Sequence, residues 1–489
     1  MRNPAVLSLL LPLLLAACGF GGGDKTVEAA VIGSSDDLSA GGIHLDAGAQ
    51  LVRGATVAGL VGFDAKGEVV PSLAERWIVT DDGRSYIFRL REGKWPNGRD
   101  VDGASARDAL KRTIRGLRGT SMGFDLAMIA DVRAMAGRVV EVRLRAPMPD
   151  FLQLLAQPEL GLLVQGAGSG DMVLKRKGNV ALLTPVPPEQ RGEPAREDWQ
   201  DHIRQVRLRA TAAKRAIALF DDGVVDVVLG GRIEALPYAD TGPLSRGTVR
   251  VDRVNGLFGL LVLRGDGFLA DPARREALAM AIDRPALVVP FNISGWQDTT
   301  RLVAAGNPDD IGTIGERWSQ LSIEQRRQIA ARRVAAWREQ NGGNAPELAV
   351  SLPDGPGSDA LFTVLRDNLA AVGVNAVRAK PGRKSDLAMF DRLARYRSVR
   401  WYLNQFNCSL RQGLCSKEAD ALVAKALEES DLAAMNATLA EAEAELTAAN
   451  IFIPFGPPLR WSLVRGSVAG FESNGWGIHP LAPLALTPK

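Results

Sequence analysis

The sequence predicts an α/β protein built from more than one domain. The chain has 489 residues, which is too long for one hydrophobic core and suggests about two to four domains. Its 46% hydrophobic and 24% charged residues are typical of a soluble globular protein. Strand-like and helix-like patterns alternate along most of the chain, and this alternation is characteristic of α/β folds.

The most informative segment covers residues 70–112. Apolar residues alternate with polar ones over 77–79 and again over 86–90, as in half-buried strands. Asp81-Asp82-Gly83 separates the two runs and predicts a tight turn, because glycine tolerates positive φ. A helix is expected from Ser105 to Arg112. The segment is therefore predicted to be a β-hairpin followed by a helix.

The same alternation continues toward the carboxyl terminus. We expect strands at 139–144, 173–175, 206–209, 224–228, 256–263, 348–352, 374–377, 386–390 and 451–455. We expect helices at 213–220, from 272 onward, at 322–340, at 358–372 and within 416–449, and a surface loop at 184–196. Asp271 and Pro272 form a strong helix start, because aspartate caps free backbone N–H groups and proline fits the first helical position.

The amino terminus has the features of a bacterial lipoprotein signal. A short basic start precedes an apolar run at 6–15, which is too short to span a bilayer. It ends in Leu15-Ala16-Ala17-Cys18, which resembles a lipobox and predicts lipidation of Cys18 after removal of residues 1–17. Residues 18–25 would form a glycine-rich tether. We expect a lipid-anchored protein on the periplasmic face of a membrane, inner or outer.

Two other cysteines, Cys408 and Cys415, lie close together. Cysteine pairs in exported proteins favour a disulfide, and Gly413 would allow a tight loop. A metal pair is the alternative, although the spacing fits no zinc pattern.

Catalytic motifs are missing from the sequence. The three histidines, His44, His202 and His479, are not at metal-ligand spacing. The sequence contains neither a G-x-S-x-G elbow nor a phosphate-binding loop. We therefore expect no enzyme, no cofactor and no metal. The net charge of +3 also gives no reason to expect nucleic-acid binding.

Two segments carry a family resemblance. Residues 71–98, Pro-Ser-Leu-Ala-Glu-Arg-Trp through Trp-Pro-Asn-Gly, and residues 271–287, Asp-Pro-Ala-Arg-Arg through Ala-Ile-Asp-Arg, resemble conserved segments of the peptide- and nickel-binding proteins of ABC importers, solute-binding family 5. The resemblance implies the type II, cluster C, periplasmic binding protein fold, with two hinged α/β lobes and an inserted third lobe. Lobe I would comprise 26–60, 165–250 and 450–489, inserted lobe II 61–164, and lobe III 251–449.

The resemblance also implies where a ligand would bind. The tentative ligand residues are Arg395, Arg397, Arg400, Trp401, Tyr402, Asn404 and Trp296, with Gly168, Ser169 and Gly170 as a hinge. In peptide-binding relatives the place of 395–404 holds an aspartate that pairs with the peptide ammonium. Here arginines replace it, which suits an acidic or blocked ligand. The alternatives are that the arginines form a solvated edge and that the aromatic residues belong to the core.

The implied function is capture of a peptide or peptide-like polar solute by hinge closure and its delivery to an ABC transporter permease. The chain would act as a monomer held at the membrane through Cys18. The alternative is a lipoprotein without a transport role, such as a sensor, chaperone or partner-binding module. Ala58, Asp171 and Arg264 stand where the family has other residues, and these departures motivate the alternative. An anchored hydrolase ranks last, because no nucleophile has a visible base.

Overall fold

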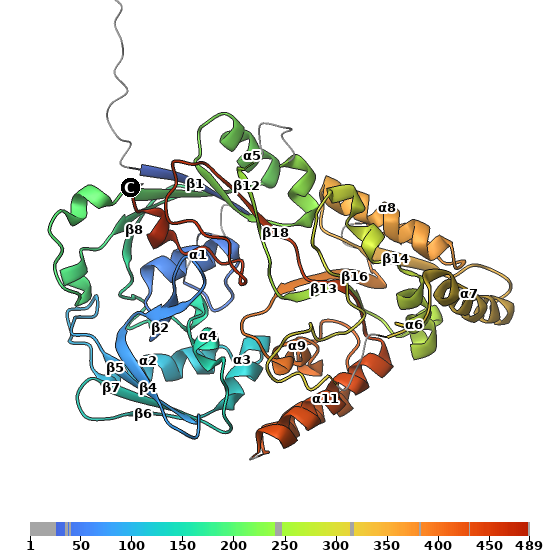
Figure 1. Cartoon of the computed structure of the whole chain (residues 1–489), viewed down its shortest axis with the longest axis horizontal. Coiled ribbons are helices and arrows are strands. Elements are labelled where there is room, and N and C mark those ends of the chain that lie inside the picture. Colours follow the sequence, from blue (N-terminus) through green and yellow to red (C-terminus); the bar gives the residue numbers. More distant parts are fainter. Residues whose placement is uncertain are drawn as a thin grey trace, which may run out of the picture.

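The computed structural model describes residues 26–34, 38, 41–239, 247–312, 317–380, 383–429 and 431–487. Within these ranges the chain forms three large β-sheets and one two-stranded sheet, with helices packed against them (Figure 1). The α/β class predicted from the sequence is confirmed. The predicted signal peptide, the tether and Cys18 lie outside the described residues.

The first sheet has seven strands in the order β12-β18-β11-β1-β10-β9-β8. Their bounds are β1 Thr26–Ile32, β8 Met172–Lys177, β9 Val180–Pro185, β10 Gln205–Thr211, β11 Val227–Gly231, β12 Val249–Asp252 and β18 Arg460–Val464. β1 is central and runs parallel to β10 and β11. Helix α1 (Ala47–Thr56) packs on one face of the sheet, and α5 (Ala213–Asp221) packs on the other. Both faces of β1 are therefore buried, as its consecutive buried apolar residues 29–31 show.

The second sheet has five strands in the order β15-β14-β16-β13-β17. Their bounds are β13 Gly256–Val262, β14 Glu347–Ser351, β15 Asn375–Arg378, β16 Leu387–Leu393 and β17 Phe452–Gly456. One face is covered by α6 (Pro272–Ala281), α7 (Ile323–Gln340) and α8 (Pro356–Ala370). The other face packs with α9 (Val399–Asn404), α10 (Lys417–Ala426) and α11 (Leu432–Ala449). Every residue of β13 is buried as a result.

The third sheet is antiparallel and lies within residues 74–144. It has the order β4-β5-β7-β6, with β4 Ala74–Val79, β5 Ser85–Leu90, β6 Ile129–Ala134 and β7 Val139–Leu144. The predicted hairpin is β4–β5, and Gly83 in its turn has a φ of +66°. Helix α2 (Gly103–Gly116) follows the hairpin, capped by Asp102, which accepts from the Ser105 amide. Short helices α3 (Ser121–Asp125) and α4 (Phe151–Leu155) complete this part, beside the small β2–β3 sheet (Val61–Phe63, Val69–Pro71).

The chain passes between the two larger sheets at two places, residues 253–255 after β12 and residues 457–459 after β17. The antiparallel sheet is inserted between β1 and β8. β17 pairs with β13 in the five-stranded sheet, although the predicted boundaries assign residues 450–489 to lobe I. The lobe boundaries stay a prediction.

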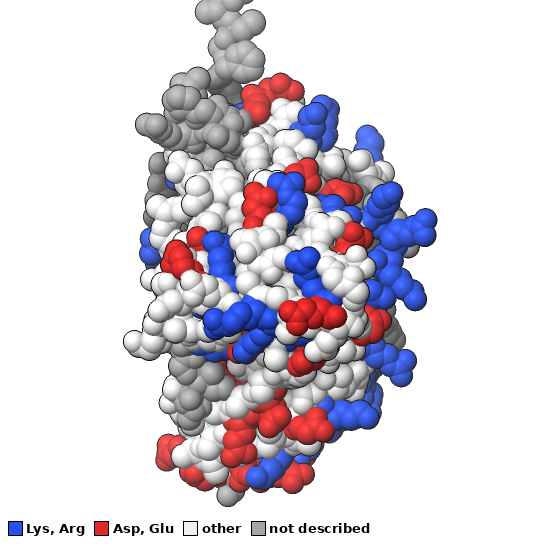
Figure 2. All heavy atoms as spheres, turned by 90° about the vertical axis from the view of Figure 1, so that its right-hand side faces the viewer, with Lys and Arg blue, Asp and Glu red and all other residues white. Residues whose placement is uncertain are grey.

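Charge is mixed over the face that carries the five-stranded sheet's outer helices. Lys and Arg side chains gather along one edge of this face, and Asp and Glu side chains gather toward the end that carries α11 (Figure 2). Among the helices of the described ranges, none combines the length and the apolar composition needed to cross a bilayer.

Candidate functional site

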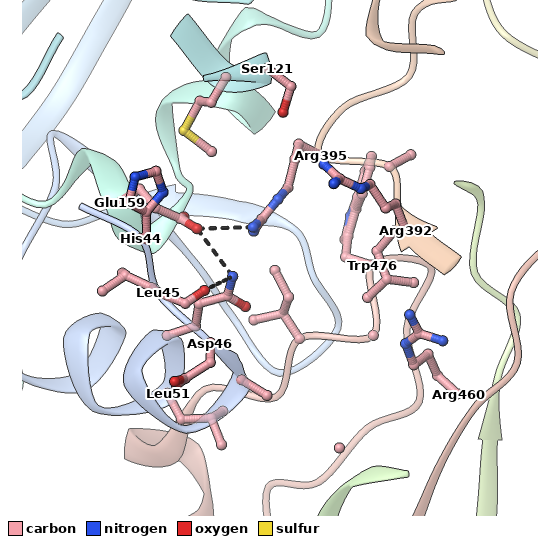
Figure 3. Close-up of a pocket in the computed structure, with 18 of the residues that line it drawn as sticks. His44, Leu45, Asp46, Leu51, Ser121, Glu159, Arg392, Arg395, Arg460 and Trp476 are labelled. Atoms are coloured by element: carbon pink, nitrogen blue, oxygen red, sulfur yellow. Dashed lines mark hydrogen bonds and ion pairs between the residues drawn. The ribbon is translucent and has the colours of Figure 1, made fainter. Parts of the chain in front are cut away.

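A cavity of about 630 Å³ opens between the seven-stranded and five-stranded sheets. The carboxyl ends of β1, β11 and β16 reach it, together with α1, the α2–α3 turn and residues 476–479. Ligands of α/β proteins commonly bind at the carboxyl ends of sheet strands and between domains. Figure 3 shows Arg395 extended toward Glu159, with Arg392, Trp476 and Arg460 on the side away from His44 and Asp46.

Arg395 and Glu159 form the ion pair that crosses this cavity. Nη2 of Arg395 donates to Oε1 of Glu159 at 2.9 Å, and Nη1 donates to Oε1 of Gln157 at 2.9 Å. Gln50 on α1 donates to the same Glu159 oxygen at 3.1 Å. The Glu159 side chain is buried, and its Oε2 has no hydrogen-bond partner. Three separate parts of the chain therefore meet at one carboxylate.

Asp125 at the end of α3 forms a second buried polar cluster at the cavity wall. Tyr396 donates its hydroxyl to Oδ1 of Asp125 at 2.9 Å, and Asn404 donates Nδ2 to the same oxygen at 2.7 Å. Arg400 donates to the backbone carbonyls of Phe124 and Asp125. Burial raises the pKa of Asp125 to about 7, against the opposing charge of Arg400. Oδ2 of Asp125 has no partner.

Arg460 and Asp391 form the most regular ion pair of the cavity wall. Two parallel bonds of 3.0 and 2.6 Å join the guanidinium to the carboxylate, and both side chains are buried. This bidentate geometry fixes the end of β16 against β18. Trp476 adds an aromatic surface and donates its indole N–H to the Gly67 carbonyl at 3.0 Å.

The residues predicted to contact ligand divide into three groups. Arg395 and Trp401 line the cavity. Arg400, Tyr402 and Asn404 are buried in α9 behind it, and burial raises the pKa of Tyr402. Arg397 lies outside, 3.5 Å from Asp150, and Trp296 donates to the Pro457 carbonyl at 2.9 Å. Their role in ligand binding stays a prediction.

Other cavity residues were missed from the sequence. They are Asp46, Gln50, Asp125, Glu159, Arg392, Arg460 and Trp476. No spacing or motif marks them, since they come from segments far apart in the chain that only the fold brings together.

The predicted hinge residues pack against the end of α1. The Ser169 carbonyl accepts from the Ala58 amide at 3.1 Å. Gly168 and Gly170 lie so close to Val57 and to the Thr56 backbone that an added Cβ would approach within 2.5 and 2.3 Å. A side chain at either glycine would therefore push this segment away from α1. The hinge assignment itself stays a prediction.

The disulfide between Cys408 and Cys415 is present in the structure, as predicted. It closes a loop that places Gln412 beside Arg392, at 3.0 Å from Nη2. In the part of the chain that the structure describes, no three His, Cys, Asp or Glu side chains are grouped to hold a metal ion.

Sequence comparison finds relatives over part of the chain. Residues 68–177 match the profile of the bacterial extracellular solute-binding proteins, family 5. The probable deoxycholate-binding periplasmic protein YgiS of Escherichia coli is 32% identical over 120 residues, which are 21% of this chain and 22% of YgiS. The glutathione-binding protein GsiB of Escherichia coli is 29% identical over 171 residues, 34% of this chain and 32% of GsiB. The matches thus span about a fifth to a third of these relatives.

Structural similarity covers nearly the whole chain. OppA of Burkholderia pseudomallei has a TM-score of 0.77 at 17% identity, over 96% of this chain and 100% of OppA. The murein tripeptide binding protein MppA of Escherichia coli has a TM-score of 0.77 at 17% identity, over 96% and 99% of the two chains. The unliganded open form of MppA scores 0.65, at 17% identity and over 96% and 98%. The resemblance predicted from the sequence is therefore confirmed: through residues 68–177 this chain is related to the bacterial extracellular solute-binding proteins of family 5, and it has their type II periplasmic binding protein fold.

Proposed function

We propose that this protein is the lipid-anchored solute-binding component of an ABC importer and captures a peptide or peptide-like polar solute. The cavity between the seven-stranded and five-stranded sheets carries the proposal. It has the size of a small-ligand site, and charged and aromatic side chains from several segments converge on it. The binding proteins YgiS and GsiB, and the fold shared with OppA and MppA, support the same assignment.

Capture would involve rotation of the two larger sheets about residues 253–255 and 457–459, with 168–170 as a further hinge segment. Contacts across the cavity support a closed arrangement. Residues 395–400 bind partners within 124–159, and the chain is more similar to one structure of MppA than to its unliganded open form.

The remaining parts of the proposal concern location and partners. Acylation at Cys18 would hold the protein at the periplasmic face of a membrane, where a monomer would deliver solute to permease subunits without catalysing a reaction. Fractionation checks the anchor: the wild-type chain should sediment with membranes, and Cys18→Ala should release it to the soluble fraction. A soluble wild-type protein would contradict lipid anchoring.

A ligand screen tests the capture function. The mature domain is titrated with di- to pentapeptides, acidic peptides, amino sugars and phosphorylated solutes, and melting temperature and radius of gyration are measured. A ligand that binds only the closed native state raises the melting temperature. At a ligand concentration of one hundred times Kd, the free energy of unfolding increases by about 2.7 kcal/mol. A melting temperature that stays constant with every class would argue against solute capture.

The second candidate is a lipoprotein without a transport role. The observation that favours it is that Arg395, Tyr396 and Arg400 already have protein partners within residues 124–159. Such contacts could hold the molecule closed without solute. If deletion of the gene leaves uptake of every binding solute unchanged, this candidate replaces the importer.

A further inference from the structure

Charge balance within the cavity singles out one side chain. The charged residues of the wall are Asp46, Asp125, Glu159, Arg232, Asp391, Arg392, Arg395 and Arg460. Arg460 pairs with Asp391, and Arg395 pairs with Glu159. Among the described residues, no carboxylate lies within ion-pair distance of Arg392. Arg232 is exposed to solvent, which can compensate its charge, whereas Arg392 is only partly exposed.

The guanidinium of Arg392 is held in place by neutral groups. Nη1 donates to Oε1 of Gln405 at 3.3 Å, and Nη2 donates to Oε1 of Gln412 at 3.0 Å. Its central carbon lies 4.7 Å from the ring centre of Phe390. Amide oxygens and an aromatic face orient a cation without cancelling its charge.

The orientation of the two glutamines has its own support. Gln405 donates its amide nitrogen to the Trp401 carbonyl at 3.1 Å, so its oxygen is left to face Arg392. Gln412 lies in the loop that the Cys408–Cys415 disulfide closes. Arg392 is therefore held in a fixed position before any ligand arrives, which reduces the entropy lost on binding.

The surroundings of Arg392 disfavour its charge. Burial lowers the pKa of Arg392, and the neighbouring Arg395 lowers it further. An arginine keeps its proton in proteins nonetheless, so the charge persists and calls for a counterion. The position of Arg392 in the cavity wall leaves the ligand to provide that counterion.

We propose that Arg392 is the specificity-determining residue of the cavity and binds an anionic group of the solute, a carboxylate or a phosphate. Gln405 and Gln412 are positioning residues that act through Arg392. This inference rests on the proposed function and narrows it: the captured solute carries a negative charge at the end that lies against β16. A neutral or purely cationic solute would leave the Arg392 charge unbalanced.

The test uses peptide probes in matched pairs. Tripeptides with a free carboxylate are compared with their carboxyl-terminal amides, and amidated phosphoserine tripeptides with amidated serine tripeptides, by calorimetry and thermal shift. We expect the anionic member of at least one pair to bind roughly 10- to 100-fold more tightly, as hydrogen bonds to charged groups imply. The pair that shows the difference identifies carboxylate or phosphate as the group bound.

Two variants locate the effect. Arg392→Gln should bring the two members of a pair to the same affinity. Gln412→Glu keeps the arginine but supplies an internal carboxylate beside Nη2, so it should lower affinity for the anionic member alone. The matched control is Arg332→Gln, which removes an exposed charge on α7 outside the cavity. It should leave the affinities for both members of a pair unchanged.

The outcomes separate this inference from the proposed function. Tight binding with equal affinity for both members of every pair would overturn the Arg392 assignment and leave solute capture standing. A preference for the anionic member that persists in both variants would also overturn it. Absence of binding by any probe or screened solute would overturn solute capture and the assignment with it.

Discussion

The hydroxyl of Tyr396 donates a hydrogen bond of 2.9 Å to the buried carboxylate of Asp125, 271 residues away in the sequence. The bond joins the end of α3, near the antiparallel sheet, to the segment between β16 and α9, and α3 and α9 lie side by side (Figure 1). Asn404 and Arg400 reinforce the same junction. Polar groups thus hold two parts of the molecule together at the cavity wall, and these contacts can be altered singly.

Asp125→Asn should flatten the pH dependence of stability. The folded-state pKa of Asp125 is about 7, above its ordinary value of 3.8, so the native state binds more protons between about pH 4 and pH 7. Stability contributed by this group is full below pH 4 and is lost as pH rises toward 7, by about 4 kcal/mol at most. Thermal unfolding from pH 4 to pH 8 measures this. Parallel profiles for the variant and the wild-type protein would contradict the assignment.

Arg395→Gln should loosen the cavity. It removes the ion pair and leaves the buried Glu159 carboxylate with Gln50 as its remaining hydrogen-bond donor, at a cost of about 1–3 kcal/mol. We expect a lower melting temperature and a larger radius of gyration by small-angle scattering. Arg397→Gln is the control from the same segment, because Arg397 is exposed and its pairing with Asp150 is long, so it should change neither quantity. Equal effects of the two variants would count against the Arg395 contact.

Cys408→Ser should lower the free energy of unfolding by about 2.5 kcal/mol, the chain-entropy value for so short a loop. The variant also frees the loop that carries Gln412, so affinity for the anionic probes should fall as well. Denaturant unfolding under oxidising conditions measures the first effect, and calorimetry measures the second. If a reducing agent lowers the free energy of unfolding of the wild-type protein by the same amount, the loss in the variant is due to the missing disulfide. No difference between oxidised and reduced protein would refute the prediction.

Arg301→Met should be among the most destabilising single changes. Arg301 is buried and pairs with Asp310 at 2.8 Å and with Glu443 on α11 at 3.0 Å. Its removal leaves two carboxylates without their cation, which costs about 3–5 kcal/mol. Arg366→Met on α8 removes an exposed pair and should cost less than about 1 kcal/mol. Chemical denaturation of the two variants compares the losses, and similar values would refute the prediction.

Local structure could be predicted well because its causes are local. The strand at 139–144 was predicted with its exact bounds, since alternation marks a half-buried strand. The Asp271 cap was also correct, and its carboxylate accepts from the Ala273 amide at 2.8 Å. No end was predicted for this helix; α6 ends at Ala281 and two short turns follow it.

The cavity could not be predicted to the same degree. Its polar contacts join residues more than two hundred positions apart, as Arg395 to Glu159 and Arg400 to Phe124 show. The arginines of 395–400 were predicted as ligand residues because of their charge. Only the fold shows that carboxylates and carbonyls of 124–159 face them. Arg392 was not predicted as a ligand residue, because its isolation from acidic groups arises only in the folded structure.

The two crossings at 253–255 and 457–459 have a mechanical consequence. They are the only covalent links between the seven- and five-stranded sheets in the sequence of described elements, and each is three residues long. Two short tethers side by side resist sliding and separation but permit turning about the line through them. Motion of one sheet relative to the other then has essentially one coordinate, and a single pair of spectroscopic labels across the cavity would follow its whole course.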